Sequence, residues 1–161
     1  MKYLLLCLSF GICLSVYTMT KDQTPPSNGL VKKQLIKTDA EWEKILDSAS
    51  FQVLRKHATE RPFSGTYLSN KAQGTYYCRA CSHPLFASST KFKSGTGWPS
   101  FWKVISDSSV IETPEGSAIY SYSEVSCAKC EGHLGHVFQD GPKPTGLRYC
   151  MNSVALFFLK K

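Results

Sequence analysis

Two short stretches decide the fold: Cys78-Arg79-Ala80-Cys81 and Cys127-Ala128-Lys129-Cys130. The two cysteines of each pair are separated by two residues, a spacing that lets both sulfurs of a tight turn point at one ion. Two such turns supply the four thiolates of a tetrahedral zinc site, which contributes folding free energy directly. Because the pairs lie far apart in the sequence, they predict a structural zinc that ties two parts of a sheet together.

Two other interpretations of these pairs stay open at the level of the sequence. The four cysteines can form disulfides, which a secreted protein would permit. One pair can instead be redox-active, although neither pair opens a predicted helix as a thioredoxin-type motif does. Zinc is favoured over both because the same spacing occurs twice.

Short runs rich in Tyr, Val, Phe and Ile surround the cysteine pairs and alternate with Gly and Pro. This pattern indicates antiparallel β-structure. The runs expected to form strands are 75–77, 104–105, 118–122, 136–138 and 147–159. Upstream, Thr38 and Glu41 fit a capping box that begins a helix over 39–47, and a second helix is expected to begin at Ser48. The predicted fold class is therefore mainly β (α+β), with short N-terminal helices.

Length and charge limit the classes of protein that fit. The chain has 161 residues, of which 42% are hydrophobic and 12% aromatic, enough for one domain with a core. Lys and Arg number 19 against 12 Asp and Glu, which gives a net charge of +7. The basic residues are scattered, with no run longer than two. A nucleic-acid partner is therefore not expected.

The N-terminal segment has the pattern of a targeting signal. In residues 1–19, one lysine precedes an apolar run that is too short for a spanning helix, as in a secretory signal peptide. An uncleaved membrane anchor is the alternative, and only then is membrane contact expected. Residues 20–36 have the composition of an exposed linker, so the domain is expected over 37–161. The expected location is the secretory route, meaning the periplasm, the endoplasmic reticulum or the outside of the cell.

Cys150 is left over when two cysteines are assigned to the signal segment and four to the metal. A leftover cysteine in a secreted protein is either a reactive thiol or a buried core residue. Alternation along the predicted strand over 147–159 puts Arg148, Cys150 and Asn152 on one face. A neighbouring arginine favours the thiolate, which is the nucleophilic form. This face is a candidate catalytic surface, although the same pattern can mark a solvated face.

Two further segments carry candidate functional groups. His133, His136 and Asp140 lie within 132–141 and are candidate acid–base groups, or else structural and turn residues. Trp98 precedes a proline on a glycine-containing loop, which restricts its backbone. A fixed tryptophan suits an apolar or sulfur-bearing ligand, and a place in the core is the alternative.

Taken together, these segments closely resemble the methionine sulfoxide reductases of type B. The resemblance spans about residues 37–159 and is carried by several long motifs. These are Thr59-Glu-Arg-Pro-Phe-Ser-Gly65, Cys78-x-x-Cys81, Ser94-Gly-x-Gly-Trp-Pro-Ser-Phe101, Cys127-x-x-Cys130, Gly132-His-Leu-Gly-His-Val-Phe138 and Pro144-Thr-Gly-Leu-Arg-Tyr-Cys-x-Asn-Ser153.

The resemblance implies a fold and a reaction. The fold would have two antiparallel sheets, short N-terminal helices and one structural Zn²⁺ held by Cys78, Cys81, Cys127 and Cys130. The enzyme would repair oxidised proteins by reducing the R epimer of methionine sulfoxide. Cys150 would be the nucleophile, and Trp98 would form the wall that receives the methyl group of the substrate. The polar positions of the active site would be His133, His136, Asp140, Arg148 and Asn152.

One departure from the family bears on the mechanism. Many members have a cysteine between the two glycines of Ser-Gly-x-Gly-Trp, which attacks the sulfenic acid, and this chain has Thr96 there. The expectation is a one-cysteine enzyme, regenerated directly by a thioredoxin-like protein or another external thiol and acting as a monomer. Two rival functions are a zinc-ribbon binding module without catalysis and a disulfide oxidoreductase with one metal-free cysteine pair.

Overall fold

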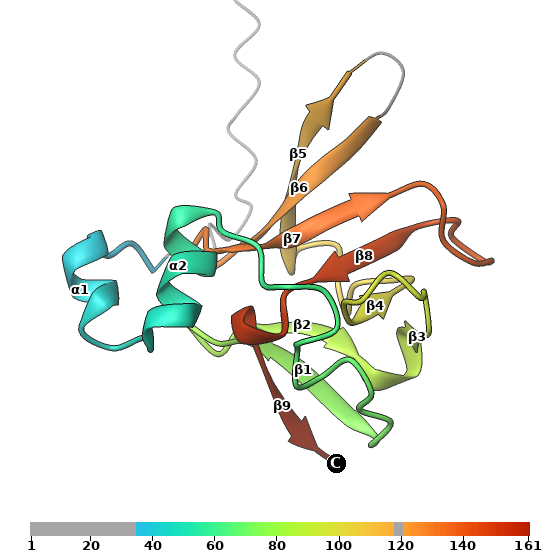
Figure 1. The fold of residues 1–161 in the computed structure, drawn as a ribbon, viewed down its shortest axis with the longest axis horizontal. Helices are drawn as coiled ribbons and strands as arrows, with labels where there is room; N and C mark the ends of the chain where they lie inside the picture. The colour runs from blue at the N-terminus through green and yellow to red at the C-terminus, as the bar shows by residue number, and fades with distance from the viewer. Residues whose placement is uncertain (1–34, 118–120) are drawn as a thin grey trace, which may run out of the picture. The chain divides into compact units, whose positions relative to one another are not determined.

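The structure is a computed structural model that describes residues 35–117 and 121–161. The predicted signal peptide over 1–19 lies outside these residues, as does the linker predicted over 20–36 except for its last two positions. In the described part, two short helices precede nine strands, as Figure 1 shows. The prediction of a mainly β fold with short N-terminal helices is confirmed.

The two helices begin where side chains satisfy their free N–H groups. Helix α1 spans Asp39–Glu43 and helix α2 spans Ser48–Lys56. The Glu41 carboxylate accepts from the Thr38 amide at 2.8 Å, and the Thr38 hydroxyl accepts from the Glu41 amide at 3.4 Å, which is the predicted capping box. Neither α-helix is long and apolar enough to cross a membrane, and the other helical segments of the described residues are the short 3₁₀ turns Ser88–Thr90 and Ser153–Ala155.

Helix α1 is shorter than predicted because α2 needs its own cap. Asp47 accepts from the Ser50 amide at 2.8 Å, and its backbone is extended, with ψ at 158°. A helix that includes residue 47 is incompatible with that cap, and in the structure α1 ends at Glu43. As a result, Ile45 is 59% exposed, whereas Trp42 is buried.

The nine strands form two antiparallel sheets, as the resemblance implied. The three-stranded sheet has the order β2-β1-β9 and the six-stranded sheet has the order β3-β4-β8-β7-β6-β5. The strands of the first are Pro84–Ala87, Gly74–Cys78 and Leu156–Lys160. Those of the second are Lys91–Phe92, Ser100–Phe101, Arg148–Met151, His133–Phe138, Ser121–Cys127 and Val110–Gly116.

Two strand predictions are wrong. Residues 104–105 form no strand, because the Ile105 amide donates to the Leu85 carbonyl outside any ladder, and the next strand begins at Val110. The strand predicted over 147–159 is interrupted by the 3₁₀ turn Ser153–Ala155. Strand β8 before the turn belongs to the six-stranded sheet, and β9 after it belongs to the three-stranded sheet. The predictions for 75–77 and 136–138 are confirmed, and 118–120 of the predicted strand over 118–122 lie outside the described residues.

Aromatic side chains join the two sheets in the core. Phe101 of β4 stacks on Phe86 of β2 with ring centroids 4.4 Å apart, and it meets Tyr76 of β1 edge-on at 5.0 Å. Tyr76 also contacts Phe158 of β9 at 4.7 Å. Stacked and edge-on aromatic pairs contribute beyond the area they bury, so this cluster holds one sheet against the other.

The different burial of the two apolar residues in the α1 segment gives a test of this fold. Replacing Trp42 by alanine should lower the free energy of unfolding by about 3–5 kcal/mol, because it leaves a cavity in the core. Ile45→Ala should change it by less than about 0.5 kcal/mol, because that side chain is exposed. Urea unfolding followed by circular dichroism measures both values. Equal losses in the two variants would contradict the short α1.

Candidate functional site

The four paired cysteines form one buried cluster. The Sγ atoms of Cys78 and Cys130 are 3.6 Å apart, those of Cys81 and Cys127 are 3.5 Å apart, and all four lie within 4.8 Å of one another. Four thiolates around one zinc, with Zn–S bonds of about 2.3 Å, would be about 3.8 Å apart. The cluster therefore fits a metal such as zinc, and none of its cysteines forms a disulfide.

The two cysteine turns share one backbone design. In the first, the Cys78 amide donates to the His83 carbonyl and the Ser82 amide donates back to the Cys78 carbonyl. In the second, Cys127 makes the corresponding two bonds with Gly132 and Glu131. Ser82 and Glu131 both have positive φ, at 57° and 58°, which tightens each turn so that two sulfurs converge. The repeated spacing thus produces a repeated geometry.

The position and electrostatics of the cluster suit a cation. Cys78 ends β1 of the three-stranded sheet and Cys127 ends β6 of the six-stranded sheet, so an ion held by both would tie the sheets together. Hydrogen bonds among the sulfurs, that of Cys130 first, lower the pKa of Cys127, while hydrogen bonds with Cys127 raise the pKa of Cys78 and Cys130. A buried thiolate needs a compensating positive charge, which a divalent metal supplies.

A separate small pocket opens beside Cys150. Cys150 of β8 is the direct cross-strand partner of Ser100 on β4 and of His136 on β7, so these three side chains share one face. The pocket has a volume of about 130 Å³. Its lining is Thr59, Trp98, Gly135, His136, Phe138, Cys150 and Asn152. Four residues predicted from three separate segments, namely Trp98, His136, Cys150 and Asn152, therefore line one pocket.

The surroundings of Cys150 act on its ionisation in opposite directions. Burial raises the pKa of the Cys150 thiol, and it is the largest influence. A contact with the Thr96 hydroxyl, 3.7 Å from the Cys150 sulfur, and the charge of Arg148 lower that pKa without overcoming the effect of burial. Arg148 therefore stabilises the Cys150 thiolate, as expected, but by less than burial destabilises it. Cys150 rests as a thiol, and its proton must leave when the sulfur reacts.

Asp140 acts on the pocket through Arg148. The guanidinium of Arg148 donates twice to the Asp140 carboxylate, at 2.8 and 2.9 Å, and lies 4.2 Å from the ring centre of Phe138. Arg148 is 7% exposed, and its hydrogen bonds, together with its charge, hold the pKa of Asp140 below its usual value. A bidentate pair fixes the orientation of a buried arginine. Asp140 itself does not line the pocket.

The two predicted histidines lie in different surroundings. His136 lines the pocket, whereas His133 is 2% exposed and does not line it. The Nδ1 of His133 lies 2.6 Å from Glu124 Oε1, and the Nδ1 of His57 lies 2.7 Å from the same oxygen. Burial lowers the pKa of His133, so its ring is neutral near pH 7. The sequence did not predict the contacts of Glu124 and His57 with His133, because nothing in the local pattern of either residue indicates them.

Glu60 is a further residue that sequence reasoning missed. Its carboxylate accepts from the amides of Ser153 and Val154 at 2.7 and 3.1 Å. The Trp98 indole donates to the Glu60 carbonyl at 3.1 Å, and the Glu60 amide donates to the Asn152 side chain at 2.9 Å. One residue thus orients two walls of the pocket. Glu60 belongs to the motif over 59–65 that carries the resemblance, but the motif alone does not indicate which groups it binds.

Comparison with known proteins agrees with this architecture. The sequence profile of the SelR domain matches residues 46–160. A Pseudomonas putida (strain W619) protein, named peptide methionine sulfoxide reductase MsrB, is 56% identical over 126 residues, which cover 78% of this chain and 95% of that protein. A Methanosarcina barkeri protein of the same name is 51% identical over 129 residues, covering 80% and 91% of the two chains.

Serine substitutions should show that the cysteine cluster and Cys150 are independent sites. The wild-type chain, purified under reducing conditions, should hold about one zinc ion. Cys127→Ser should lose the ion and unfold at a lower temperature, because metal binding and folding are coupled. Elemental analysis and thermal unfolding measure the two effects. The same substitution at Cys150 is the control and should retain the metal; metal loss in both variants would contradict separate sites.

The Thr96 contact predicts the pH dependence of Cys150. Thr96→Val removes a contact that lowers the pKa of Cys150, so that pKa should rise and the thiolate should form only at higher pH. The rate of alkylation of Cys150 by iodoacetamide, followed by mass spectrometry across pH, should therefore have a midpoint shifted upward. Thr113→Val, on exposed β5, is the matched control and should leave the midpoint unchanged. An unshifted midpoint in Thr96→Val would show that the contact does not act on the thiol.

Proposed function

The chain belongs to the family of SelR-domain peptide methionine sulfoxide reductases, and on that premise we propose that it reduces methionine-R-sulfoxide in proteins, with Cys150 as nucleophile. The observation that carries this proposal is the single small pocket shared by Cys150, His136 and Trp98. It combines a nucleophile, a proton donor and an aromatic wall. A binding module without catalysis would leave this combination without a use.

The pocket suits the end of one side chain. Its volume of about 130 Å³ is below the roughly 300–1,000 Å³ of typical small-molecule pockets. The S-methyl group of the substrate would lie against Trp98 and Phe138, because sulfur-bearing groups make favourable contacts with aromatic rings. The main chain of the substrate would then remain outside the pocket. This arrangement supports a protein-bound sulfoxide as substrate.

The chemical step transfers oxygen and two electrons. Cys150 loses its proton and attacks the sulfoxide, whose oxygen must be protonated before it can leave. The S–O bond of the substrate breaks and an S–O bond forms at Cys150, which becomes a sulfenic acid. The two electrons that the Cys150 sulfur loses are those that reduce the substrate sulfur, and methionine is released. We assign the proton transfer to His136, because it is the cross-strand partner of Cys150 and lines the pocket. His133 is buried outside the pocket.

Other residues of the site have positioning roles in this scheme. Arg148, held by Asp140, favours negative charge on the Cys150 sulfur as the proton leaves. Asn152 is fixed from both sides, since its amide group donates to the Leu134 carbonyl at 3.0 Å and accepts from Glu60. Its contribution is a rigid polar wall that orients the sulfoxide oxygen.

We propose a one-cysteine cycle for regeneration. The four other cysteines in the described residues form the metal cluster, and the side chain next to Cys150 on the facing loop is Thr96. An external thiol would attack the sulfenic acid, releasing water and leaving a mixed disulfide, and a second thiol would then free Cys150. A thioredoxin-like protein or a small thiol can serve as this reductant. The chain would act as a monomer.

The remaining proposals concern the metal and the location. The ion held by the four cysteines would be Zn²⁺ with a purely structural role, because four thiolates leave no open position for a substrate. We retain the secretory route as a proposal, supported by the lysine and apolar run within residues 1–19. The SelR profile begins at residue 46, so this segment lies outside the conserved domain.

A single turnover tests the reaction and the cycle together. With no reductant, an oxidised peptide of R configuration should leave the protein about 16 Da heavier at Cys150, the mass of one oxygen. The S epimer should produce no such species, and Cys150→Ser should produce none with either epimer. Mass spectrometry of the intact protein and of its Cys150 peptide gives the result. Turnover of the R epimer by Cys150→Ser would contradict the proposal that Cys150 is the nucleophile.

Thr96→Cys is the informative companion variant. The Thr96 hydroxyl is 3.7 Å from the Cys150 sulfur, so a sulfur at that position should reach the sulfenic acid. This variant should end the same turnover about 2 Da lighter than its reduced form, as expected for a disulfide. An intramolecular disulfide in the wild type would contradict the one-cysteine cycle while leaving the reductase activity in place.

A further inference from the structure

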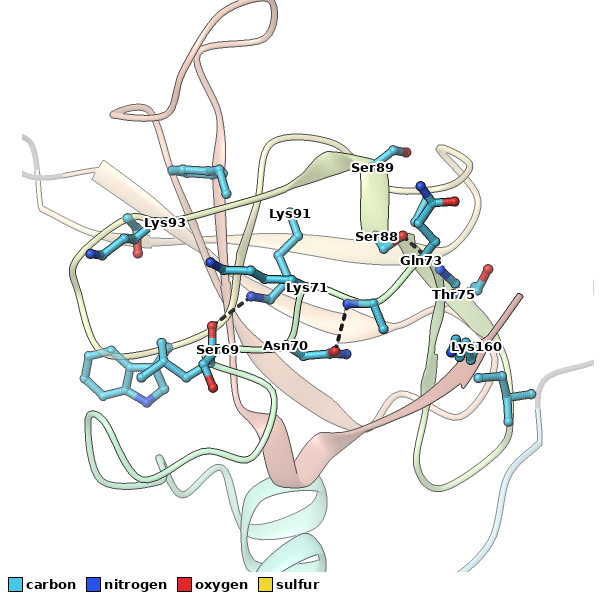
Figure 2. A pocket seen from close by; sticks show the side chains of 18 of the residues that line it. Ser69, Asn70, Lys71, Gln73, Thr75, Ser88, Ser89, Lys91, Lys93 and Lys160 are labelled. Carbon is cyan, nitrogen blue, oxygen red and sulfur yellow. Dashed lines mark hydrogen bonds between the residues drawn. The ribbon is translucent and has the colours of Figure 1, made fainter.

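A second and much larger cavity adjoins the pocket of Cys150. It has a volume of about 1340 Å³, above the roughly 300–1,000 Å³ of small-molecule pockets. Segments 68–75, 87–89, 91–95 and 159–161 contribute most of its walls (Figure 2). Trp98 lines this cavity and also lines the pocket that contains Cys150. The large cavity therefore begins at the wall of the reactive pocket.

Lysines dominate the charge of this cavity, which we call the lysine groove. Its charged lining residues are Lys71, Lys91, Lys93, Lys160 and Lys161, with no aspartate or glutamate among the described lining residues. None of these five lysines lies within ion-pair distance of a carboxylate in the described part of the chain. Figure 2 shows Lys93 and Lys160 toward opposite ends of the groove, with Lys71 and Lys91 between them.

The central lysine is poorly compensated. The Nζ of Lys91 donates to the Leu68 carbonyl at 2.8 Å, and the side chain is partly buried. That burial lowers the pKa of Lys91, because the charged form has lost water without gaining a carboxylate. A ligand carboxylate beside Lys91 would stabilise its charged form in place of the lost water. The other positive charges along the groove also favour a negatively charged ligand.

The groove also has an apolar entrance next to the site. Phe63 is 69% exposed, and its amide donates to the Gly97 carbonyl at 2.8 Å, which fixes it beside the loop of Trp98. Phe63 and Trp98 both line the groove. Exposed aromatic side chains are enriched at surfaces that bind protein segments.

We propose that the lysine groove binds the segment flanking the oxidised methionine and that it selects substrates with aspartate or glutamate beside the methionine sulfoxide. The inference rests on the proposed function and adds a substrate class to it. The pocket of Cys150 accepts only the end of one side chain, so the neighbouring residues of a substrate must lie outside it, and Trp98 directs one side of that segment into the groove. Carboxylates on this segment would meet the uncompensated lysines.

Charge reversal in the groove tests the proposal. The probes are synthetic peptides that carry methionine-R-sulfoxide between acidic, neutral or basic neighbours, with dithiothreitol as reductant so that no protein reductant has to dock. In the wild type, KM should be lowest for the acidic peptide. Lys71→Glu combined with Lys93→Glu should raise that KM by at least roughly fivefold and leave kcat unchanged, because neither lysine contacts the reacting atoms. Added salt should narrow the difference between the peptides.

Two further double variants serve as controls, one for net charge and one for folding. Lys44→Glu combined with Lys103→Glu changes the net charge equally at exposed positions outside the groove and should leave all KM values unchanged. If the glutamate pair in the groove fails to fold, Lys71→Ser with Lys93→Ser replaces it and should shift KM in the same direction. Equal KM values for all peptides, in the wild type and in the groove variant, would overturn the groove inference with the reductase intact.

Two further results would point elsewhere. If the groove variant raises KM only for a thioredoxin reductant and not for acidic peptides, the groove binds the reductant and the substrate inference is wrong. If the wild type reduces none of the peptides, the proposed function itself fails. The two failures are distinguishable because the first retains turnover with dithiothreitol.

Discussion

The half-buried carboxylate of Glu60 is the contact on which the arrangement of the site depends. By accepting from the amides of Ser153 and Val154, it takes these groups out of any strand ladder, so the chain turns after β8 and enters the other sheet as β9. The backbone of Glu60 binds the Trp98 indole and the Asn152 side chain. The interaction that divides the last strand therefore also orients the walls around Cys150.

The five described cysteines lie in two different surroundings. Cys78, Cys81, Cys127 and Cys130 face one another in a buried cluster at the ends of strands from different sheets. Cys150 instead lies at a pocket whose groups act in opposite directions on its ionisation, burial favouring the thiol and Thr96 with Arg148 favouring the thiolate. Identical side chains thus acquire different chemistry from burial and neighbours.

Local patterns were predictable from the sequence, and contacts between distant segments were not. The capping box, the second helix and the paired cysteine turns depend on neighbours within a few residues, and all three appear in the structure. Strand alternation grouped Arg148, Cys150 and Asn152 on one face. In the structure β8 ends at Met151, Cys150 and Asn152 line the pocket, and Arg148 acts on Cys150 without lining it. The break at Ser153 depends on Glu60, far upstream, and the surroundings of His133 depend on Glu124 and His57. Contacts between residues so far apart in the chain produce no periodic pattern in a single sequence.

The order of the strands has a consequence for biosynthesis. Strand β1 pairs along its whole length with β9, which contains residues 156–160 at the end of the chain, and the two turns of the cysteine cluster come from opposite parts of the domain. A ribosome-bound chain that has emerged only through β7 possesses all four cysteines of the cluster and the β1–β2 pair, but it lacks β8 with Cys150 and β9, the second partner of β1. The four cysteines can thus come together before the three-stranded sheet is complete, and Cys150 joins the fold after them.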